Sequence, residues 1–160
     1  MHKDIRFRFA RPEDCELILS FIRGLALYEK MEDEVVATPE KLRNTLFEQK
    51  YAEVLFVLVE GKEVGFALFF HNYSTFLGQS GIYLEDLFVK EEERGKGYGK
   101  ALLKKLAAIA LERDCGRLEW SCLKWNKPSL EFYHSLGAKE MDEWVGLRLT
   151  RESMEALTES

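Results

Sequence analysis

Cysteine and histidine are scarce in this 160-residue chain, which contains 3 of each. The cysteines, Cys15, Cys115 and Cys122, form no CxxC pair and leave one thiol over, which disfavours a disulfide scaffold and favours a reducing compartment. Burial as small hydrophobic side chains explains them better than a role as acyl-carrying nucleophiles. The histidines show neither HExxH nor paired spacing, so we predict no metal site.

Long apolar runs and an excess of basic residues are also missing. No stretch approaches the length of a membrane span, and the N-terminal segment MHKDIRFRF lacks the apolar core of a signal peptide. The chain has 28 acidic and 23 basic residues, a net charge of -5, and no basic stripe. We therefore expect a cytoplasmic protein that binds neither membranes nor nucleic acid. The negative balance fits a cationic partner, although a solvated acidic surface is the commoner explanation.

Length and composition predict a single domain over residues 1–160, because such a chain, 46% hydrophobic, can bury one core. Apolar patterns predict strands over residues 5–9, 54–60, 64–71, 82–89, 118–123 and 145–149. Helices are predicted over about 12–28, 38–49, 99–115 and 126–137, with a weakly helical tail over 152–157. Residues 72–81 are expected to form a loop. This order predicts a mixed α/β fold, one sheet with helices on both faces.

The segment RGKGYGKALL places Gly95, Gly97 and Gly99 between an expected strand and an amphipathic helix. Glycine disfavours a helix, so its repetition at a helix start indicates that something approaches the backbone closely. Backbone N–H groups and the helix dipole make such a loop an anion site, and a Cβ would hold phosphates away from these donors. The loop lacks the hydroxyl residue of a Walker motif at Ala101 and the third glycine of a dinucleotide fingerprint at Lys100.

These residues match the (Q/R)xxGx(G/A) signature of the GCN5-related N-acetyltransferases, and the expected order of elements resembles that family over nearly the whole chain. The resemblance implies a mostly antiparallel central sheet flanked by helices, and acetyl-coenzyme A as cosubstrate without a metal. It also implies that backbone amides of the loop bind the diphosphate of coenzyme A. The residues concerned are Arg94, Gly95, Lys96, Gly97, Tyr98, Gly99 and Lys100.

Three further segments, DCELILSFIRGLALYEK, YLEDLFV and WNKPSLEFYHSLGA, are similar to the spermidine/spermine (diamine) acetyltransferases and their thialysine-acetylating relatives. This similarity implies a small cationic amine as substrate and a homodimer. For the pantetheine arm of the cofactor, the implied contacts are Leu87, Phe88 and Val89, with Asn126, Pro128 and Ser129 at its far end. For the amine, the implied binding residues are Tyr28, Glu29, Glu85 and Asp86, and the implied general acid is Tyr133.

Acetyl transfer requires a group that takes the proton of the ammonium, and Glu85 is the candidate base. A lysine-like ammonium has a pKa near 10.4, so reaching the free amine at neutral pH costs about 4 kcal/mol. Glu85 and Asp86 interrupt an otherwise apolar strand, which favours a functional role over edge charges that deter strand pairing. For Tyr28 and Glu29, an exposed helix end remains an equal alternative.

The departing thiolate requires a proton donor, and Tyr133 fits because a phenol is neutral at pH 7 and can donate. Spacing alone favours packing for Tyr133, since apolar side chains form a stripe along the same short helix. The resemblance of the segment FYHSLGA favours the acid role instead. Backbone amides near Leu87 could stabilise the oxyanion without any particular side chain.

The resemblance breaks near Gly146, where the polyamine acetyltransferases have an acidic residue and a tryptophan and this chain has Val145 and Leu147. The core reaction is unaffected, but the choice among amines stays open. The sequence therefore predicts an acetyl-coenzyme A-dependent N-acetyltransferase that acts on a polyamine, diamine or lysine-like amino acid by direct attack in a ternary complex. A protein or peptide amine as acceptor, or a non-catalytic coenzyme A-binding regulatory module, are the alternatives.

Overall fold

The computed structural model describes residues 4–160. The chain forms two compact units, one ending at Ser121 and one comprising Cys122–Ser160. The first three residues belong to the segment expected to carry no signal peptide, and they lie outside the described part. The single domain expected over residues 1–160 stays a prediction.

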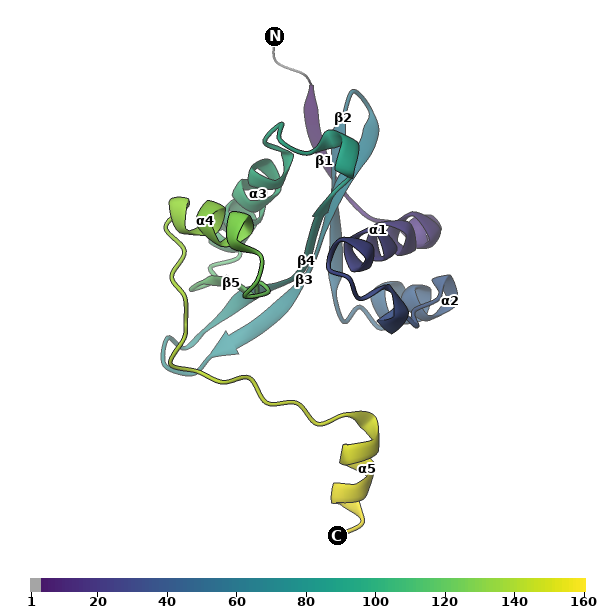
Figure 1. Ribbon diagram of the computed structural model, residues 1–160, viewed down its shortest axis with the longest axis vertical. Coiled ribbons are helices and arrows are strands. Elements are labelled where there is room, and N and C mark those ends of the chain that lie inside the picture. The colour runs from purple at the N-terminus through teal and green to yellow at the C-terminus, as the bar shows by residue number, and fades with distance from the viewer. Residues whose placement is uncertain (1–3) are drawn as a thin grey trace. The chain divides into compact units, whose positions relative to one another are not determined.

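The first unit is built on a five-stranded sheet with the strand order β1-β2-β3-β4-β5 (Figure 1). Its strands are β1 (Ile5–Phe9), β2 (Glu53–Val59), β3 (Lys62–Ser74), β4 (Gln79–Val89) and β5 (Leu118–Trp120). Neighbouring strands pair antiparallel from β1 to β4, whereas β5 pairs parallel to β4. The parallel pair follows from an intervening helix, which returns the chain to the same end of the sheet. The predicted mixed, mostly antiparallel sheet is confirmed.

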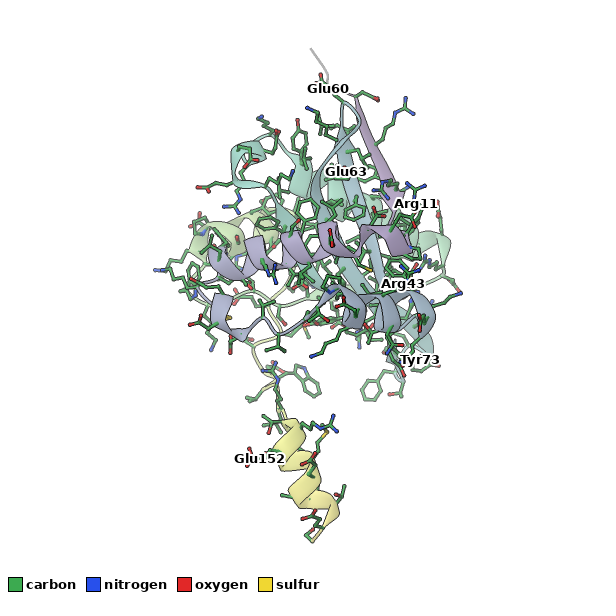
Figure 2. The ribbon with its side chains drawn as sticks, turned by 90° about the vertical axis from the view of Figure 1, so that its right-hand side faces the viewer. Arg11, Arg43, Glu60, Glu63, Tyr73 and Glu152 are labelled. Atoms are coloured by element: carbon green, nitrogen blue, oxygen red, sulfur yellow. The ribbon has the colours of Figure 1, made fainter. Side chains whose placement is uncertain are left out.

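Helices cover both faces of this sheet. They are α1 (Cys15–Tyr28), α2 (Pro39–Leu42) and α3 (Tyr98–Glu112). Figure 1 shows α1 and α2 on one face and α3 on the other, and Figure 2 looks onto α1 and α2, with Arg11 and Arg43 labelled near them. After α2 the chain winds as a π-helix over Arg43–Glu48, so the predicted second helix is confirmed in extent and differs in its winding.

Two apolar layers fix these helices to the sheet. Beneath α1, the ring of Phe21 lies 5.4 Å from that of Phe66 on β3 and 6.1 Å from that of Phe88 on β4. Beneath α3, Leu102 and Leu106 are completely buried. Burial of side chains of this size contributes about 1.5–3 kcal/mol each. The core therefore holds the middle of α1 and the first half of α3 against the sheet.

The start of α1 is held by an ion-pair cluster around Arg8 of β1. Arg8 donates hydrogen bonds to both carboxylate oxygens of Asp14, at 2.8 and 3.0 Å, and to Glu63 of β3 at 2.8 Å. These bonds hold the pKa of Asp14 and the pKa of Glu63 below their usual values. Figure 2 labels Glu63 close to the turn between β2 and β3. These hydrogen bonds tie the start of α1 to β1 and β3.

The loop expected over residues 72–81 is mostly strand. β3 and β4 remain paired as far as Ser74 and Gln79, which leaves only a short turn. Gly81, one of the residues that suggested a loop, instead permits a close approach within the sheet. A Cβ at this position would lie 2.6 Å from Oδ1 of Asn72.

The second unit contains α4 (Lys127–Ser135) and α5 (Arg151–Thr158), so the helical tail is confirmed. The strand expected over residues 145–149 is wrong, and Val145 and Leu147 are 81% and 94% exposed. Alternating apolar residues form a strand only where a neighbouring strand completes the hydrogen bonds. Within residues 4–160, no strand follows Trp120, so β5 also ends earlier than predicted.

None of the helices between residues 4 and 160 combines the length and apolar character that a membrane crossing requires.

Candidate active site

The acidic pair on β4 lies at a β-bulge. In the pairing with β3, Asp86 lies opposite Leu68 and Leu84 lies opposite Phe69, so Glu85 is an extra residue on β4. The interruption predicted for this strand thus takes the form of a bulge. Bulges bend a strand and redirect its side chains, and they are frequent beside active sites.

The bulge also places Asp86 and Tyr83 on one face of the sheet. Residues three apart on a regular strand point to opposite faces. Here Asp86 pairs with Leu68 and Tyr83 pairs with Phe70, and these two partners are two residues apart on β3. Paired residues share a face, so Asp86 and Tyr83 both lie on the face on which Leu68 packs against the core beneath α1.

Beyond the bulge, β5 leaves one edge of β4 unpaired. β5 pairs with β4 only from Ile82 to Leu84, whereas β4 continues to Val89. On its other edge, Leu87, Phe88 and Val89 pair with β3. Within residues 4–160, no strand pairs with the second edge over these residues. An extended, amide-containing ligand could therefore pair with β4 there, as a further strand would.

The glycine loop connects the end of β4 to α3. Gly95 and Gly97 have φ values of +79° and +87°, a left-handed conformation that favours glycine, and Gly97 is the N-cap of α3. A Cβ built on either residue would meet no atom within 4 Å. On Gly99, a Cβ would come only to 4.0 Å from Val89. Within residues 4–160, no packed side chain therefore fills the space beside Gly95 and Gly97.

Donors at this loop come mainly from the backbone. The N–H of Ala101 donates to the carbonyl of Gly97 at 3.0 Å, which is the first hydrogen bond of the helix. The N–H groups of Tyr98, Gly99 and Lys100 come before it in the chain, in the first turn, where the N–H groups of a helix have no partner within the helix. The ammonium of Lys96 is paired with Glu93 at 3.1 Å. Backbone N–H groups at the start of a 15-residue helix form a site for an anion such as a diphosphate.

A group of carboxylates forms where the end of α1 meets the bulge. Glu29 caps α1, Glu85 is exposed, and Asp86 is half-buried. Burial, helped by the negative charges of Glu85 and Glu29, raises the pKa of Asp86 to about 6. Burial also raises the pKa of Glu29. The negative charge of Glu29 thus acts on Asp86, more than fifty positions away along the chain, and a cation bound near Asp86 would relieve this repulsion.

Two tyrosines beside these carboxylates have defined partners. The hydroxyl of Tyr83 lies 2.7 Å from Oγ of Ser121, and its ring centroid lies 5.4 Å from that of Phe70. The ring of Tyr28 lies beneath the guanidinium of Arg94, 4.6 Å from its Cζ. Tyr83 was not among the predicted site residues, although its place two residues before Glu85 on the same strand is a usable signal.

In the second unit, the segment from Asn126 to Ser129 forms the start of α4. The side chain of Asn126 accepts a hydrogen bond from the N–H of Ser129 at 3.4 Å, and Pro128 occupies the first turn. These features cap the helix, so the sequence pattern has a local structural explanation besides cofactor binding. Tyr133 on the same helix is half-buried, which keeps part of its side chain accessible. The contacts predicted for these four residues stay predictions.

The cysteines and His71 have defined surroundings in the structure. Cys15 and Cys115 are buried and Cys122 is half-buried, and burial raises the pKa of the Cys15 thiol. His71 lies between the carbonyl of Gly81 and the guanidinium of Arg113, at 3.1 and 2.9 Å. Among residues 4–160, no group of three or more His, Cys, Asp or Glu side chains is arranged to hold a metal ion.

Comparison with known proteins identifies the relatives of this chain. The model of the acetyltransferase (GNAT) family matches residues 22–138. The chain is 38% identical over 164 residues to a thialysine N-epsilon-acetyltransferase from Bos taurus, covering 97% of this chain and 96% of the relative. It is 31% identical over 198 residues to the L-ornithine N5-acetyltransferase NATA1 from Arabidopsis thaliana, covering 95% of this chain and 87% of the relative.

A solved structure shares the fold of this chain. An integron cassette protein from the mobile metagenome of V. cholerae has a TM-score of 0.81 and 28% identity to this chain, covering 99% of this chain and 100% of that protein. The family model covers the bulge on β4, the open strand edge and the glycine loop. The chain therefore belongs to the GNAT family and is an N-acetyltransferase.

Proposed function

We propose that this N-acetyltransferase uses acetyl-coenzyme A to acetylate a small cationic amine, which is a polyamine, a diamine or a lysine-like amino acid. The observation that carries the proposal is the half-buried Asp86 at the bulge of β4, on which the negative charges of Glu85 and Glu29 act. An ammonium bound there would neutralise charge that the fold has partly buried. The names of the relatives support this choice, because thialysine and L-ornithine are amino acids with a side-chain amine.

The open edge of β4 and the glycine loop fit the cosubstrate. Backbone groups of Leu87, Phe88 and Val89 would pair with the amides of the pantetheine arm. The space above Gly95 and Gly97 would admit the diphosphate to the N–H groups at the start of α3. Acetyl-coenzyme A supplies the thioester that makes the acetyl group reactive. The protein holds this molecule along one strand and the loop that follows it.

On the amine side, Glu29 and Asp86 attract the ammonium and Glu85 accepts its proton, directly or through water. Glu85 suits this role because it lies in the bulge and remains exposed to solvent. The neutral amine nitrogen then forms the new C–N bond while the C–S bond breaks. The surplus proton of the nitrogen passes to solvent, and solvent restores the proton that Tyr133 gives to the departing sulfur. Backbone N–H groups near Leu87 on the open edge would stabilise the negative charge that develops on the oxygen.

On the leaving-group side, Tyr133 donates a proton to the departing sulfur, and Asn126, Pro128 and Ser129 line the far end of the pantetheine arm. The half-buried position of Tyr133 supports this role, because a buried packing residue could not reach a ligand. The homodimer implied by the resemblance and the cytoplasmic location stay predictions.

Release of coenzyme A thiol on incubation with acetyl-coenzyme A and a panel of amines tests the proposed function. We expect turnover with at least one of thialysine, L-ornithine and spermidine, because each presents a terminal ammonium to the carboxylates. A peptide with a free N-terminus is the matched comparison. Turnover of the peptide alone would contradict the proposed substrate class.

Gly97→Asp should weaken binding of coenzyme A by about 10-fold or more, because it adds bulk and negative charge where the diphosphate is expected. Gly61→Asp is a matched control, since Gly61 has a φ of +82° and equally open surroundings in the β2–β3 turn. The two changes impose similar backbone strain. Calorimetry that shows equal affinity for both variants, with both folded, would refute the assignment of the loop.

Asp86 should make amine turnover depend on pH. Above a pH of about 6 its carboxylate attracts the ammonium, and below this pH the neutral acid does not. We therefore expect kcat/KM for thialysine to fall as the pH drops below about 6, through a rise in KM. In Asp86→Asn the value should be roughly 10-fold lower at neutral pH and independent of this ionisation.

Glu29→Gln provides the control for this titration. Removing a negative neighbour lowers the pKa of Asp86, so the fall in kcat/KM should move to lower pH. Persistence of the wild-type pH profile in Asp86→Asn would show that another group is responsible.

Tyr133→Phe should lower kcat by about 10²–10⁴-fold, which is the usual contribution of a positioned general acid. The change deletes one oxygen and retains the ring, so thermal stability should be nearly preserved. Affinity for acetyl-coenzyme A should change only modestly, because the hydroxyl acts most strongly as negative charge develops on sulfur. A stable variant that keeps most of its kcat while chemistry limits the rate would remove Tyr133 from the mechanism.

A further inference from the structure

Arg94, the residue before the first glycine of the loop, is held by contacts within the first unit. Its Cζ lies 4.6 Å from the ring centroid of Tyr28 and 5.4 Å from that of Phe88. Its Nε donates a hydrogen bond to the carbonyl of Val89 at 3.1 Å. The guanidinium is thus fixed to the last residue of α1 and to the end of β4, although the residue is largely exposed.

These contacts connect two parts of the site that the sequence separates by more than sixty residues. Gly95 follows Arg94 directly, so the position of Arg94 depends on the conformation of the loop. Glu29 follows Tyr28 directly, and the charge of Glu29 acts on Asp86 at the bulge. The contact between Arg94 and Tyr28 therefore joins the loop expected to bind the diphosphate to the end of α1, beside the carboxylate of Glu29.

The body of α1 is seated too closely on the sheet to shift easily. A Cβ on Gly24 would lie 2.7 Å from Cζ of Phe88, so the helix and the strand are in direct contact at this point. The last turn of α1 extends beyond that contact and ends at Tyr28, whose ring is covered by Arg94. Adjustment is therefore easiest at this end of the helix, where Tyr28 and Glu29 lie.

We propose that Arg94 is a positioning residue that couples cofactor binding at the glycine loop to amine binding at the end of α1, an inference that rests on the proposed function. A diphosphate bound at the loop restricts Arg94, and Arg94 in turn restricts Tyr28 and the adjacent Glu29. Each ligand then binds more tightly in the presence of the other, by the same factor in both directions. A residue that served only as a diphosphate ligand would produce no such coupling.

The coupling can be measured without turnover, from the dissociation constant of coenzyme A with and without a saturating amine. Thialysine, L-ornithine and spermidine serve in turn as the amine probe. In the wild type we expect an amine to tighten coenzyme A binding by about 2- to 5-fold, the effect of one cation–π contact at an exposed site. In Arg94→Lys the factor should fall to about 1, because lysine keeps the charge and loses the planar face and Nε donor.

Further variants separate loss of the coupling from loss of a side chain that simply binds coenzyme A. Tyr28→Leu removes the ring from the other side and should also abolish the coupling, whereas Tyr28→Phe retains the ring and should preserve it. Arg23→Lys makes the same exchange at an exposed position of α1 and should leave the coupling unchanged. Melting temperatures confirm that each variant is folded.

Arg94→Lys that weakens coenzyme A binding equally with and without amine, or that retains the wild-type coupling, would overturn the proposal. A wild-type protein that binds coenzyme A with no effect of any of these amines would overturn it as well, and would leave coenzyme A binding intact. Failure of the wild type to bind coenzyme A at all would instead refute the proposed function, together with this inference.

Discussion

The bulge at Glu85 is the constraint on which the site depends. One unpaired residue on β4 changes the alternation of the strand, so that Asp86 and Tyr83 lie on the face covered by α1. It occurs where β5 ends, and β4 continues beyond it with one edge open. A regular strand would direct Asp86 to the opposite face, and a longer β5 would occupy the edge on which an extended ligand can pair.

Two opposite electrostatic sites lie along one stretch of chain. At the bulge, carboxylates that repel one another and are partly withdrawn from water favour a bound cation. A few residues later, backbone N–H groups at the start of α3 favour a bound anion, with little help from Lys96, which is paired with Glu93. Because β4 is fixed by the core on both faces, the distance between these sites is set by the fold. This separation suits a reaction between a cationic amine and a phosphorylated cosubstrate.

Elements marked by local sequence patterns were predictable from the sequence, whereas contacts between distant segments were not. The strand, glycine loop and α3 follow one another directly, so pattern and turn chemistry predicted them. The contact of Arg94 with Tyr28 joins segments far apart in the chain, and no local pattern indicates it. The prediction of a strand around Val145 is wrong because alternating apolar residues form a strand only beside a neighbouring strand, and the sequence pattern does not show whether one is present. The amine-side residues were indicated only by resemblance, since an acidic helix end such as Glu29 is common on exposed surfaces.

A carbon-13 NMR titration of the Asp86 carboxyl, in the free protein and with saturating spermidine, tests the central claim most directly. The account predicts that Asp86 titrates near pH 6 in the free protein, because it is buried among other carboxylates. Bound amine should lower the pKa of Asp86 by more than about 1 unit, since a nearby cation favours the carboxylate. An ordinary carboxyl pKa near 4 in the free protein, or a pKa that the amine leaves unchanged, would contradict the account.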